Sequence, residues 1–334
     1  MQQRSRVTIN DVARAADVSV ATVSKVLNGR YGVAVATAAK VKQVVDELGY
    51  ESSLVARSLR SRRTNVIGIL VAEFEPFSTE LLKGTSQAIA DTGYELLAYS
   101  GGGRAGGDVG WERRYLSRLS GTLIDGAILV TPTVVDASNG VPVVAVDPHT
   151  GPSGMPTVDS DSLRGAVMAT EYLLDLGHRR IGFLGGRPDL ESARLREEGY
   201  RTALLDAGIV PDPALMRVGG YRRETADQPA HELLTMPDRP TAIFAANDLS
   251  AIRTMDVARS LGLRVPDDLS VIGFDNVPES ATTTPPLTTI NQPIQRMGSE
   301  AIQLLVGLMD GGAGASTHIT LSTELVERGS CRAL

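Results

Sequence analysis

The sequence contains a single cysteine, Cys331, among 334 residues. One thiol excludes an internal disulfide and suits a reducing compartment, and its place in the C-terminal tail predicts an exposed side chain without a role. Aromatic residues make up only 4% of the chain. No apolar run approaches the roughly 18 residues of a membrane span, and residues 1–10 lack the apolar core of a signal peptide. We therefore expect a cytoplasmic protein that does not contact a membrane.

The sequence also lacks the patterns of a metal site or a catalytic centre. None of the histidines has a Cys or His partner at ligand spacing, and His178 is interpreted as a turn residue after a helix. No G-x-S-x-G elbow occurs. Residues 101–106 fit G-x-G-x-x-G, but more loop residues follow where a helix should begin, which favours a glycine-rich loop over a dinucleotide site. We expect no cofactor, no metal and no enzymatic activity.

Charge is distributed unevenly along the chain. Residues 1–64 carry 11 lysines and arginines against 5 acids, a net charge of +6 within a chain of net charge −6, which leaves −12 on the remainder. A basic segment joined to an acidic one indicates that only the first segment meets a polyanion such as DNA.

Residues Thr8–Asn28 predict two short helices separated by a tight turn. Thr8 and Asp11 have the spacing of a capping box, and Ser19 can cap the second helix. A third helix is expected over Val35–Leu48, and this arrangement predicts an all-α helix-turn-helix head. The predicted core face of the third helix is Ala38, Val41, Val44, Val45 and Leu48.

In helix-turn-helix proteins the start of the second helix faces base edges in the major groove. Val20 and Ala21 can contact thymine methyl groups, and Lys25 can reach guanine acceptors. Phosphate contacts are expected from Thr8, Ser19, Thr22, Ser24 and Asn28. The alternative is a three-helix bundle that binds nothing, and the positive charge argues against it.

The stretch TINDVARAADVSVATVSKVLNG, followed by LGYESSLVARSLRSRRTNVIGIL, resembles the LacI/GalR family of bacterial transcription regulators. The resemblance covers essentially the whole chain and implies a homodimeric repressor of a palindromic operator. It also implies a hinge helix, over about Ser53–Ser61, that folds only on DNA. The matched position for the leucine wedged into the minor groove is Leu59, with Ala56 beside it, and such a wedge unstacks and kinks the duplex.

Three positions depart from the family pattern. Glu51-Ser52-Ser53 replaces the usual x-Pro-Asn, Ala34 replaces a serine that caps the third helix, and Lys25 replaces an arginine. Loss of the cap costs about 1 kcal/mol, and lysine offers a point charge instead of a bidentate fork. These departures concern the operator sequence and leave the expectation of DNA binding intact.

From Asn65 onward, apolar strand-like runs alternate with amphipathic helices, which predicts an α/β body of two doubly wound parallel sheets. The expected strands are Val66–Val71, Tyr94–Tyr99, Gly126–Val130, Val141–Val146, Arg180–Leu184, Thr241–Ala245 and Leu269–Phe274. The expected helices are Ser78–Asp91, Trp111–Leu119, Ser162–Leu176, Glu191–Ala207, Thr225–Leu234, Leu249–Leu261 and Gln292–Met309.

The resemblance implies a periplasmic-binding-protein-like body of two lobes. The expected division is a DNA-binding head at 1–50, a hinge at 51–64 and an effector-binding and dimerisation body at 65–334. Lobe 1 is expected at about 65–159 and 291–321, and lobe 2 at about 160–290 and 322–330. The crossovers are expected near Val158–Ser162, Leu287–Asn291 and Leu321–Glu324.

Ligands of such sheets bind beyond the C-terminal ends of the strands. In the family, the positions that match Asp147, Arg196, Asn247 and Asp275 are effector contacts. Carboxylates and amides suit the hydroxyl groups of a sugar, and aromatic walls are expected from Tyr221, Phe74 and Phe77. Asp159, Asp161 and Asp248 are interpreted mainly as helix N-caps.

Several alternatives stay open from sequence alone. Arg196 could hold a sugar or the carboxylate of another effector, such as the ligand of a purine-sensing regulator. The effector could release DNA or promote its binding. A solute-binding protein with the same body is the second hypothesis, against which the basic head argues, and a cleft enzyme is the third. The tail at 328–334 has no leucine heptads, so a dimer is expected.

Overall fold

The computed structural model describes residues 7–27, 31–50, 63–101, 109–133, 140–151, 154–312 and 317–334. The chain forms two compact units, the head at Met1–Thr64 and the body at Asn65–Leu334. The predicted hinge helix, with Ala56 and Leu59, lies outside the described residues, as do Asn28 and most of the glycine-rich loop.

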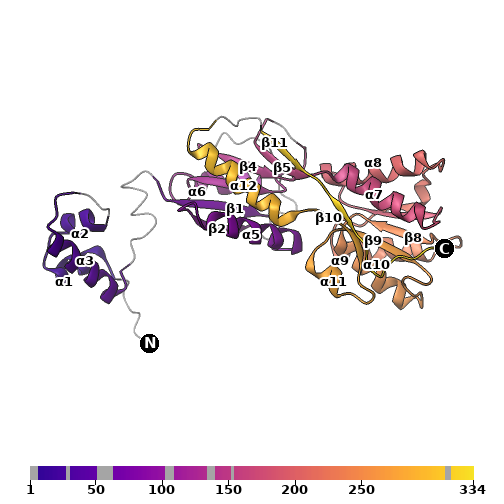
Figure 1. Cartoon of the computed structure of the whole chain (residues 1–334), viewed down its shortest axis with the longest axis horizontal. Coiled ribbons are helices and arrows are strands. Elements are labelled where there is room, and N and C mark those ends of the chain that lie inside the picture. Colours follow the sequence, from indigo (N-terminus) through magenta and orange to yellow (C-terminus); the bar gives the residue numbers. More distant parts are fainter. Residues whose placement is uncertain are drawn as a thin grey trace. The chain divides into compact units, whose positions relative to one another are not determined.

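The two units contain the following helices and strands, most of which are labelled in Figure 1. They are α1 (Ile9–Ala16), α2 (Val20–Leu27), α3 (Val35–Leu48), β1 (Val66–Val71), α5 (Pro76–Ile89), β2 (Glu95–Ser100), α6 (Trp111–Leu119), β3 (Gly126–Val130), β4 (Val143–Val146), β5 (Thr157–Ser160), α7 (Ser162–Asp175), β6 (Ile181–Gly185), α8 (Glu191–Asp206), β7 (Met216–Val218), α9 (Arg223–Leu234), β8 (Ala242–Ala245), α10 (Asp248–Ser260), β9 (Ser270–Asp275), α11 (Pro278–Thr282), β10 (Thr288–Asn291), α12 (Ile294–Met309), β11 (His318–Leu321) and β12 (Glu324–Val326).

The two helices of the helix-turn-helix begin as the sequence predicts. The backbone N–H and the hydroxyl of Thr8 donate to the Asp11 carboxylate at 3.0 and 2.7 Å. Helix α1 stops at Asp17, whose φ of 54° is left-handed. The Ser19 hydroxyl accepts the N–H of Thr22 at 3.1 Å and caps α2. Both helix starts are therefore fixed by short polar side chains.

The core of the head lies where the three helices cross. Val12, Ala16, Val23 and Val41 are fully buried, and α3 has the bounds that the sequence predicts, with no side-chain cap at Ala34. The prediction that Leu48 belongs to this core is wrong, because Leu48 is 38% exposed in the last turn of α3.

The body contains two six-stranded sheets. The sheet of lobe 1 has the order β11-β5-β4-β3-β1-β2, and the sheet of lobe 2 has the order β12-β10-β9-β8-β6-β7. All pairs are parallel except β10 with β12. In lobe 1, α5 and α12 pack together against the sheet (Figure 1). This is the doubly wound parallel architecture expected from the alternation of strands and helices.

Alternate residues of the lobe 2 strands pack against different helices. Phe183 and Phe244 face the core formed with α7 and α8, whereas Leu184 and Ile243 face the core formed with α9 and α10. Because both faces are covered, the strands read as continuous apolar runs.

Within the described residues of the body, the chain passes between the lobes three times. The passages lie at Asp161 between β5 and α7, at residues 292–293 between β10 and α12, and at residues 322–323 between β11 and β12. The first and third fall inside the expected crossovers. The second expected stretch, Leu287–Asn291, instead contains the whole of β10 and ends immediately before the passage. The strands β5, β7, β10, β11 and β12 were not predicted as strands.

The C-terminal tail packs on lobe 2. The Cys331 thiol donates to the carbonyl of Val271 at 3.2 Å, and burial raises its pKa to about 12. The N–H of Leu334 donates to the carbonyl of Leu176 at 3.0 Å. The expectation of an exposed thiol is therefore wrong.

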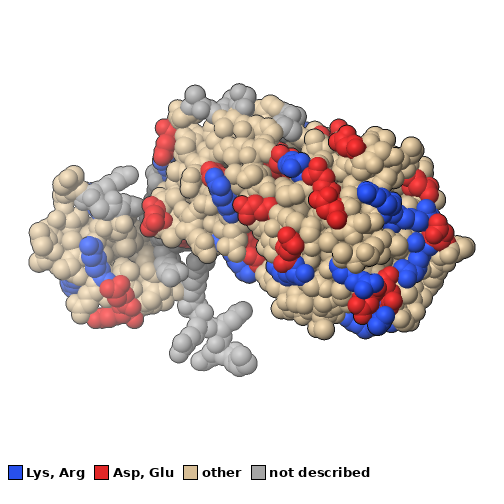
Figure 2. All heavy atoms as spheres, turned by 45° about the vertical axis from the view of Figure 1, so that its right-hand side comes forward, with Lys and Arg blue, Asp and Glu red and all other residues tan. Residues whose placement is uncertain are grey.

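Acidic and basic side chains are interspersed over the face of the body seen in Figure 2. Many form ion pairs, such as Arg217 with Glu232 at 2.9 Å. Within the described ranges, no helix combines the length and apolar character needed to cross a bilayer.

Candidate functional site

A cavity of about 500 Å³ lies between the two lobes, at the C-terminal ends of their strands. Lobe 1 contributes the residues after β1, β3 and β4, and lobe 2 those after β6, β7, β8 and β9. Six of the seven expected effector-contact residues line it, namely Phe77, Asp147, Arg196, Tyr221, Asn247 and Asp275. Phe74 is not among the lining residues, and its side chain is 53% exposed.

Arg196 is the positioned cation of the cavity. It lies on α8, is 3% exposed, and its guanidinium lies 3.8 Å from the centroid of the Phe274 ring. Its Nη1 donates to the carbonyl of Ala246 at 2.6 Å and lies 3.5 Å from Asp275 Oδ1. Because its orientation is fixed by several contacts, Arg196 can present its remaining N–H groups to a ligand without further ordering.

Two carboxyl groups line the cavity from opposite lobes, those of Asp147 and Asp275. Burial raises the pKa of Asp147 to about 6 and that of Asp275 to about 7, although the Arg196 charge acts to lower both. Asp275 Oδ1 accepts from Gln292 Nε2 at 2.5 Å, and Asp147 Oδ2 accepts from the Ser192 hydroxyl at 3.1 Å. Buried carboxyls with raised pKa values are typical of ligand sites.

A hydrogen bond joins Asn247 to the backbone of Tyr221. Asn247 Nδ2 donates to the Tyr221 carbonyl at 3.1 Å, and Asn247 Oδ1 accepts from the N–H of Ser250 at 3.0 Å, which caps α10. The Asn247 amide is thus used largely inside the protein. The Tyr221 hydroxyl is buried and has no hydrogen bond that meets the geometric criteria within the described part of the chain. An unpaired buried hydroxyl is costly unless a ligand satisfies it.

Backbone strain gathers at this cavity. Thr131, Asp147, Tyr221 and Asp275 line it and have φ values of 45°, 47°, 68° and 118°. Non-glycine residues rarely adopt positive φ, and each instance costs on the order of 1–3 kcal/mol. Such strain persists where side chains must be aimed, which supports this cavity as the functional site.

Several lining residues were missed by sequence reasoning. Glu75 follows β1 and accepts from the N–H groups of Phe77 and Ser78 at 2.7 and 2.8 Å, which caps α5. Ser192 lies four residues before Arg196 and hence on the same face of α8. The helical spacing from Arg196 could have identified Ser192, whereas the Gln292 contact joins distant segments and has no local signal.

One of the three aspartates interpreted as N-caps has that role. Asp161 Oδ1 accepts the N–H of Arg164 at 2.9 Å. Asp159 instead pairs with His318 at 2.7 Å. Asp248 Oδ2 accepts the N–H of Val277 at 2.9 Å, so it links α10 to the loop after β9.

His178 is buried within the C-terminal packing of lobe 2. Its Nδ1 lies 2.9 Å from the Thr241 hydroxyl, and its Nε2 lies 3.1 Å from the carbonyl of Arg332. These contacts give it a structural role that the turn interpretation did not foresee.

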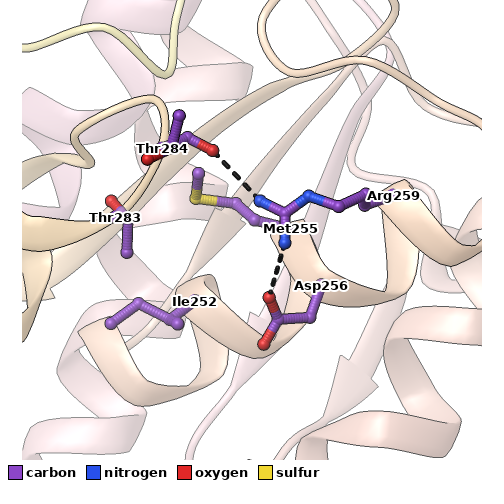
Figure 3. A pocket seen from close by; sticks show the side chains of 6 residues that line it. All are labelled: Ile252, Met255, Asp256, Arg259, Thr283 and Thr284. Carbon is purple, nitrogen blue, oxygen red and sulfur yellow. Dashed lines mark hydrogen bonds and ion pairs between the residues drawn. The ribbon is translucent and has the colours of Figure 1, made fainter.

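A second hollow of about 420 Å³ lies on lobe 2 between α10 and the loop after α11 (Figure 3). The guanidinium of Arg259, which lines this hollow, donates to Asp256 Oδ1 at 3.2 Å and to the carbonyl of Thr284 at 3.0 Å. The hollow contains none of the strained residues of the first cavity, so the inter-lobe cavity is the stronger candidate.

The candidate DNA contacts lie on and around α2 of the head. On α2, the exposed residues include Val20, Ala21 and Lys25, while Val23 and Val26 are buried in the core of the head. Ser19 also lies within 2.9 Å of the Thr22 hydroxyl. Among the described residues, no cluster of His, Cys, Asp and Glu could hold a metal ion.

Comparison with known protein families agrees with this arrangement. Residues 8–53 match the bacterial regulatory proteins of the lacI family, and residues 170–331 match a periplasmic binding protein-like domain. The HTH-type transcriptional repressor PurR of Photobacterium profundum is 35% identical, over 98% of this chain and 99% of the relative.

Solved structures show the same fold. The CelR–cellobiose complex is 32% identical with a TM-score of 0.72, over 97% of this chain and 100% of that chain. The lac repressor dimer bound to operator and the anti-inducer ONPF is 27% identical with a TM-score of 0.84, over 98% of this chain and 100% of that chain. The relatives are transcriptional regulators, which confirms the expectation of a regulator and not an enzyme. The chain therefore belongs to the LacI family of bacterial transcriptional repressors.

Proposed function

We propose that this repressor binds a palindromic operator as a cytoplasmic homodimer and is released from it by a small sugar in the inter-lobe cavity. The observation that carries the sugar assignment is the convergence of Asp147, Asp275 and Arg196 with the unpartnered Tyr221 hydroxyl in one cavity. Carboxylates accept hydrogen bonds from vicinal hydroxyls, and an arginine donates to ring and hydroxyl oxygens.

The charges of the cavity favour an uncharged ligand. Arg222 pairs with Glu73 at 2.8 Å, Arg187 with Asp189 at 2.6 Å and Arg196 with Asp275 at 3.5 Å. Each of these guanidiniums already has a carboxylate beside it. An anionic ligand would therefore add negative charge to a site that is already acidic. The CelR structure holds cellobiose, which supports the sugar class for a relative of this fold.

The division of labour follows the chain. Residues 1–50 read DNA through α2, residues 51–64 form the hinge, and the body at 65–334 binds the effector and dimerises. Leu59, with Ala56 beside it, enters the minor groove at the operator centre, and the contacts from Thr8, Ser19, Val20, Ala21, Thr22, Ser24, Lys25 and Asn28 flank it. A rotation of one lobe against the other on effector binding separates the paired hinges.

A thermal-shift screen of the full chain tests the effector class. Neutral mono- and disaccharides, their phosphorylated or oxidised forms, and purines are compared, because a ligand at 100 times its Kd adds about 2.7 kcal/mol to stability. Stabilisation by a neutral sugar, with release of operator DNA at the same concentration, is the expected result. Stabilisation by purines alone would replace the sugar assignment with a non-sugar metabolite, and an effector that strengthens operator binding would make the ligand a co-repressor.

A further inference from the structure

An ion pair joins the two lobes at the edge of the cavity. Arg222, in the segment between β7 and α9 of lobe 2, donates from Nη2 to Glu73 Oε1 of lobe 1 at 2.8 Å. Both residues line the cavity. Their side chains are 53% and 37% exposed, so the pair lies between the cavity and the solvent.

Other polar contacts also join the lobes: His149 Nδ1 lies 3.2 Å from Asp189 Oδ2, and the Ser192 hydroxyl donates to Asp147 Oδ2 at 3.1 Å. The carbonyl of His149, in lobe 1, accepts the N–H of Glu191 at 3.0 Å and Arg194 Nη2 at 3.2 Å, both from α8 of lobe 2. His149 itself is 8% exposed. Glu73 and Arg222, by contrast, meet through two partly exposed side chains and can part without unpacking a core.

The carboxylate of Glu73 lies near that of Glu75 in lobe 1. The Glu73 carboxylate acts to raise the pKa of Glu75, whose pKa is already raised by burial. Arg222 offsets this repulsion between two neighbouring acids of lobe 1.

We propose that Glu73 and Arg222 form a clasp that holds the lobes together before any ligand binds, so that a ligand reaches the cavity when this pair opens. An exposed ion pair shifts an equilibrium by up to about five-fold. The clasp thus biases the balance between closed and open bodies, which leaves a ligand able to reverse it. Because salt screens exposed charges, high ionic strength weakens the clasp.

Cavity access can be measured in the full-length protein without any ligand or DNA. Leu190 lines the cavity and is 7% exposed, so a thiol introduced by Leu190→Cys in a Cys331→Ala background reports opening through its rate of modification by methyl methanethiosulfonate. We expect Glu73→Arg and Arg222→Glu each to raise this rate several-fold. The double swap, Glu73→Arg with Arg222→Glu, should restore the parent rate.

The matched control is Arg217→Glu, which breaks the pair with Glu232 within lobe 2 and should leave the rate unchanged. Raised salt should speed modification of the parent protein more than that of either single variant. Single variants that match the parent, or a double swap that stays as fast as the single variants, would overturn the clasp. The experiment uses no effector, so its outcome is separate from that of the thermal-shift screen for the effector class.

Discussion

The guanidinium of Arg196 lies over the ring of Phe274, with its Cζ atom 3.8 Å from the ring centroid. The ring covers one face of a charge that is otherwise buried beside Asp275. This stacking leaves the N–H edge of the guanidinium for hydrogen bonds, because the face and the edge of the group carry different interactions. Arg196 is thus both a structural member of lobe 2 and the donor that the cavity offers to a ligand.

Replacing Arg196 should therefore destabilise the body as well as the ligand site. Arg196→Gln leaves Asp275 without its cation. Above about pH 7, where Asp275 is ionised in the folded protein, breaking a buried pair costs about 3–5 kcal/mol. Urea unfolding of the full chain should show this loss in the free energy of unfolding. Arg201→Gln on the same helix breaks an exposed pair with Glu197 and should cost less than about 1 kcal/mol; equal losses for the two variants would contradict the buried-pair account.

The raised pKa values in the cavity predict a pH dependence of stability. At pH values between the ordinary pKa near 3.8 and the folded values of about 6 and 7, the folded protein holds protons on Asp147 and Asp275 that the unfolded chain has released. The contribution of these groups to stability therefore falls as pH rises through this range. The melting temperature of Asp275→Asn should fall less than that of the wild type between about pH 5 and pH 7.

Other groups change over the same range, so the comparison with a variant is essential. Burial lowers the pKa of His149 and His178, and their contribution to stability rises with pH, the opposite sense. Asp267→Asn, at an exposed carboxylate paired with Arg264, serves as the control and should follow the wild type. Parallel curves for wild type and Asp275→Asn would refute the assignment.

The crossing of α5 and α12 predicts a third effect. A Cβ added at Gly84 would lie 1.8 Å from the carbonyl oxygen of Gln295, and one at Gly298 would lie 2.4 Å from that of Leu81. Gly84→Ala should destabilise lobe 1 by at least about 2 kcal/mol, since overpacking forces the backbones apart. Gly307, also on α12, has open space around it, and Gly307→Ala should stabilise by roughly 0.5–1 kcal/mol. Denaturant unfolding distinguishes these opposite signs.

The proposed recognition of the operator centre depends on Leu59, which lies outside the described residues. Leu59→Ala should weaken binding to the specific operator far more than binding to random DNA, because the wedge acts only where paired hinges meet a kinkable step. Gel-shift titrations at one salt concentration measure both affinities. An equal loss on both DNAs would remove the wedge from the account.

Much of the fold could be predicted because local patterns and long-range packing agree. Helices α3 and α6 and strands β1 and β3 have the predicted bounds, since each is a strongly periodic or continuously apolar segment between clear stops. The five missed strands have only three or four residues each, with polar side chains among them. Their conformation is imposed by neighbouring strands, which sequence periodicity does not reveal.

The candidate site divides in the same way. Asp147 and Asp275 were found because each follows a predicted strand, and parallel strands bring their ends to one edge. The pairing of Glu73 with Arg222 joins positions 149 residues apart, and no local pattern encodes it. Asn247 was predicted as an effector contact, yet its amide caps α10 and holds Tyr221, so a residue can line a site while its polar groups serve the fold.

The central claim is that a sugar in the cavity controls DNA binding. An operator titration tests it most directly, with the full-length wild type and Arg196→Lys compared. Each protein is titrated with and without the sugar identified by the thermal-shift screen. Lysine keeps a positive charge beside Asp275 but loses the fork and its stacking. We predict that the sugar lowers operator affinity at least tenfold for the wild type and leaves Arg196→Lys unchanged, while both proteins bind the operator equally without sugar. An equal response of the two proteins to the sugar, or no response of the wild type to any sugar, would contradict the account.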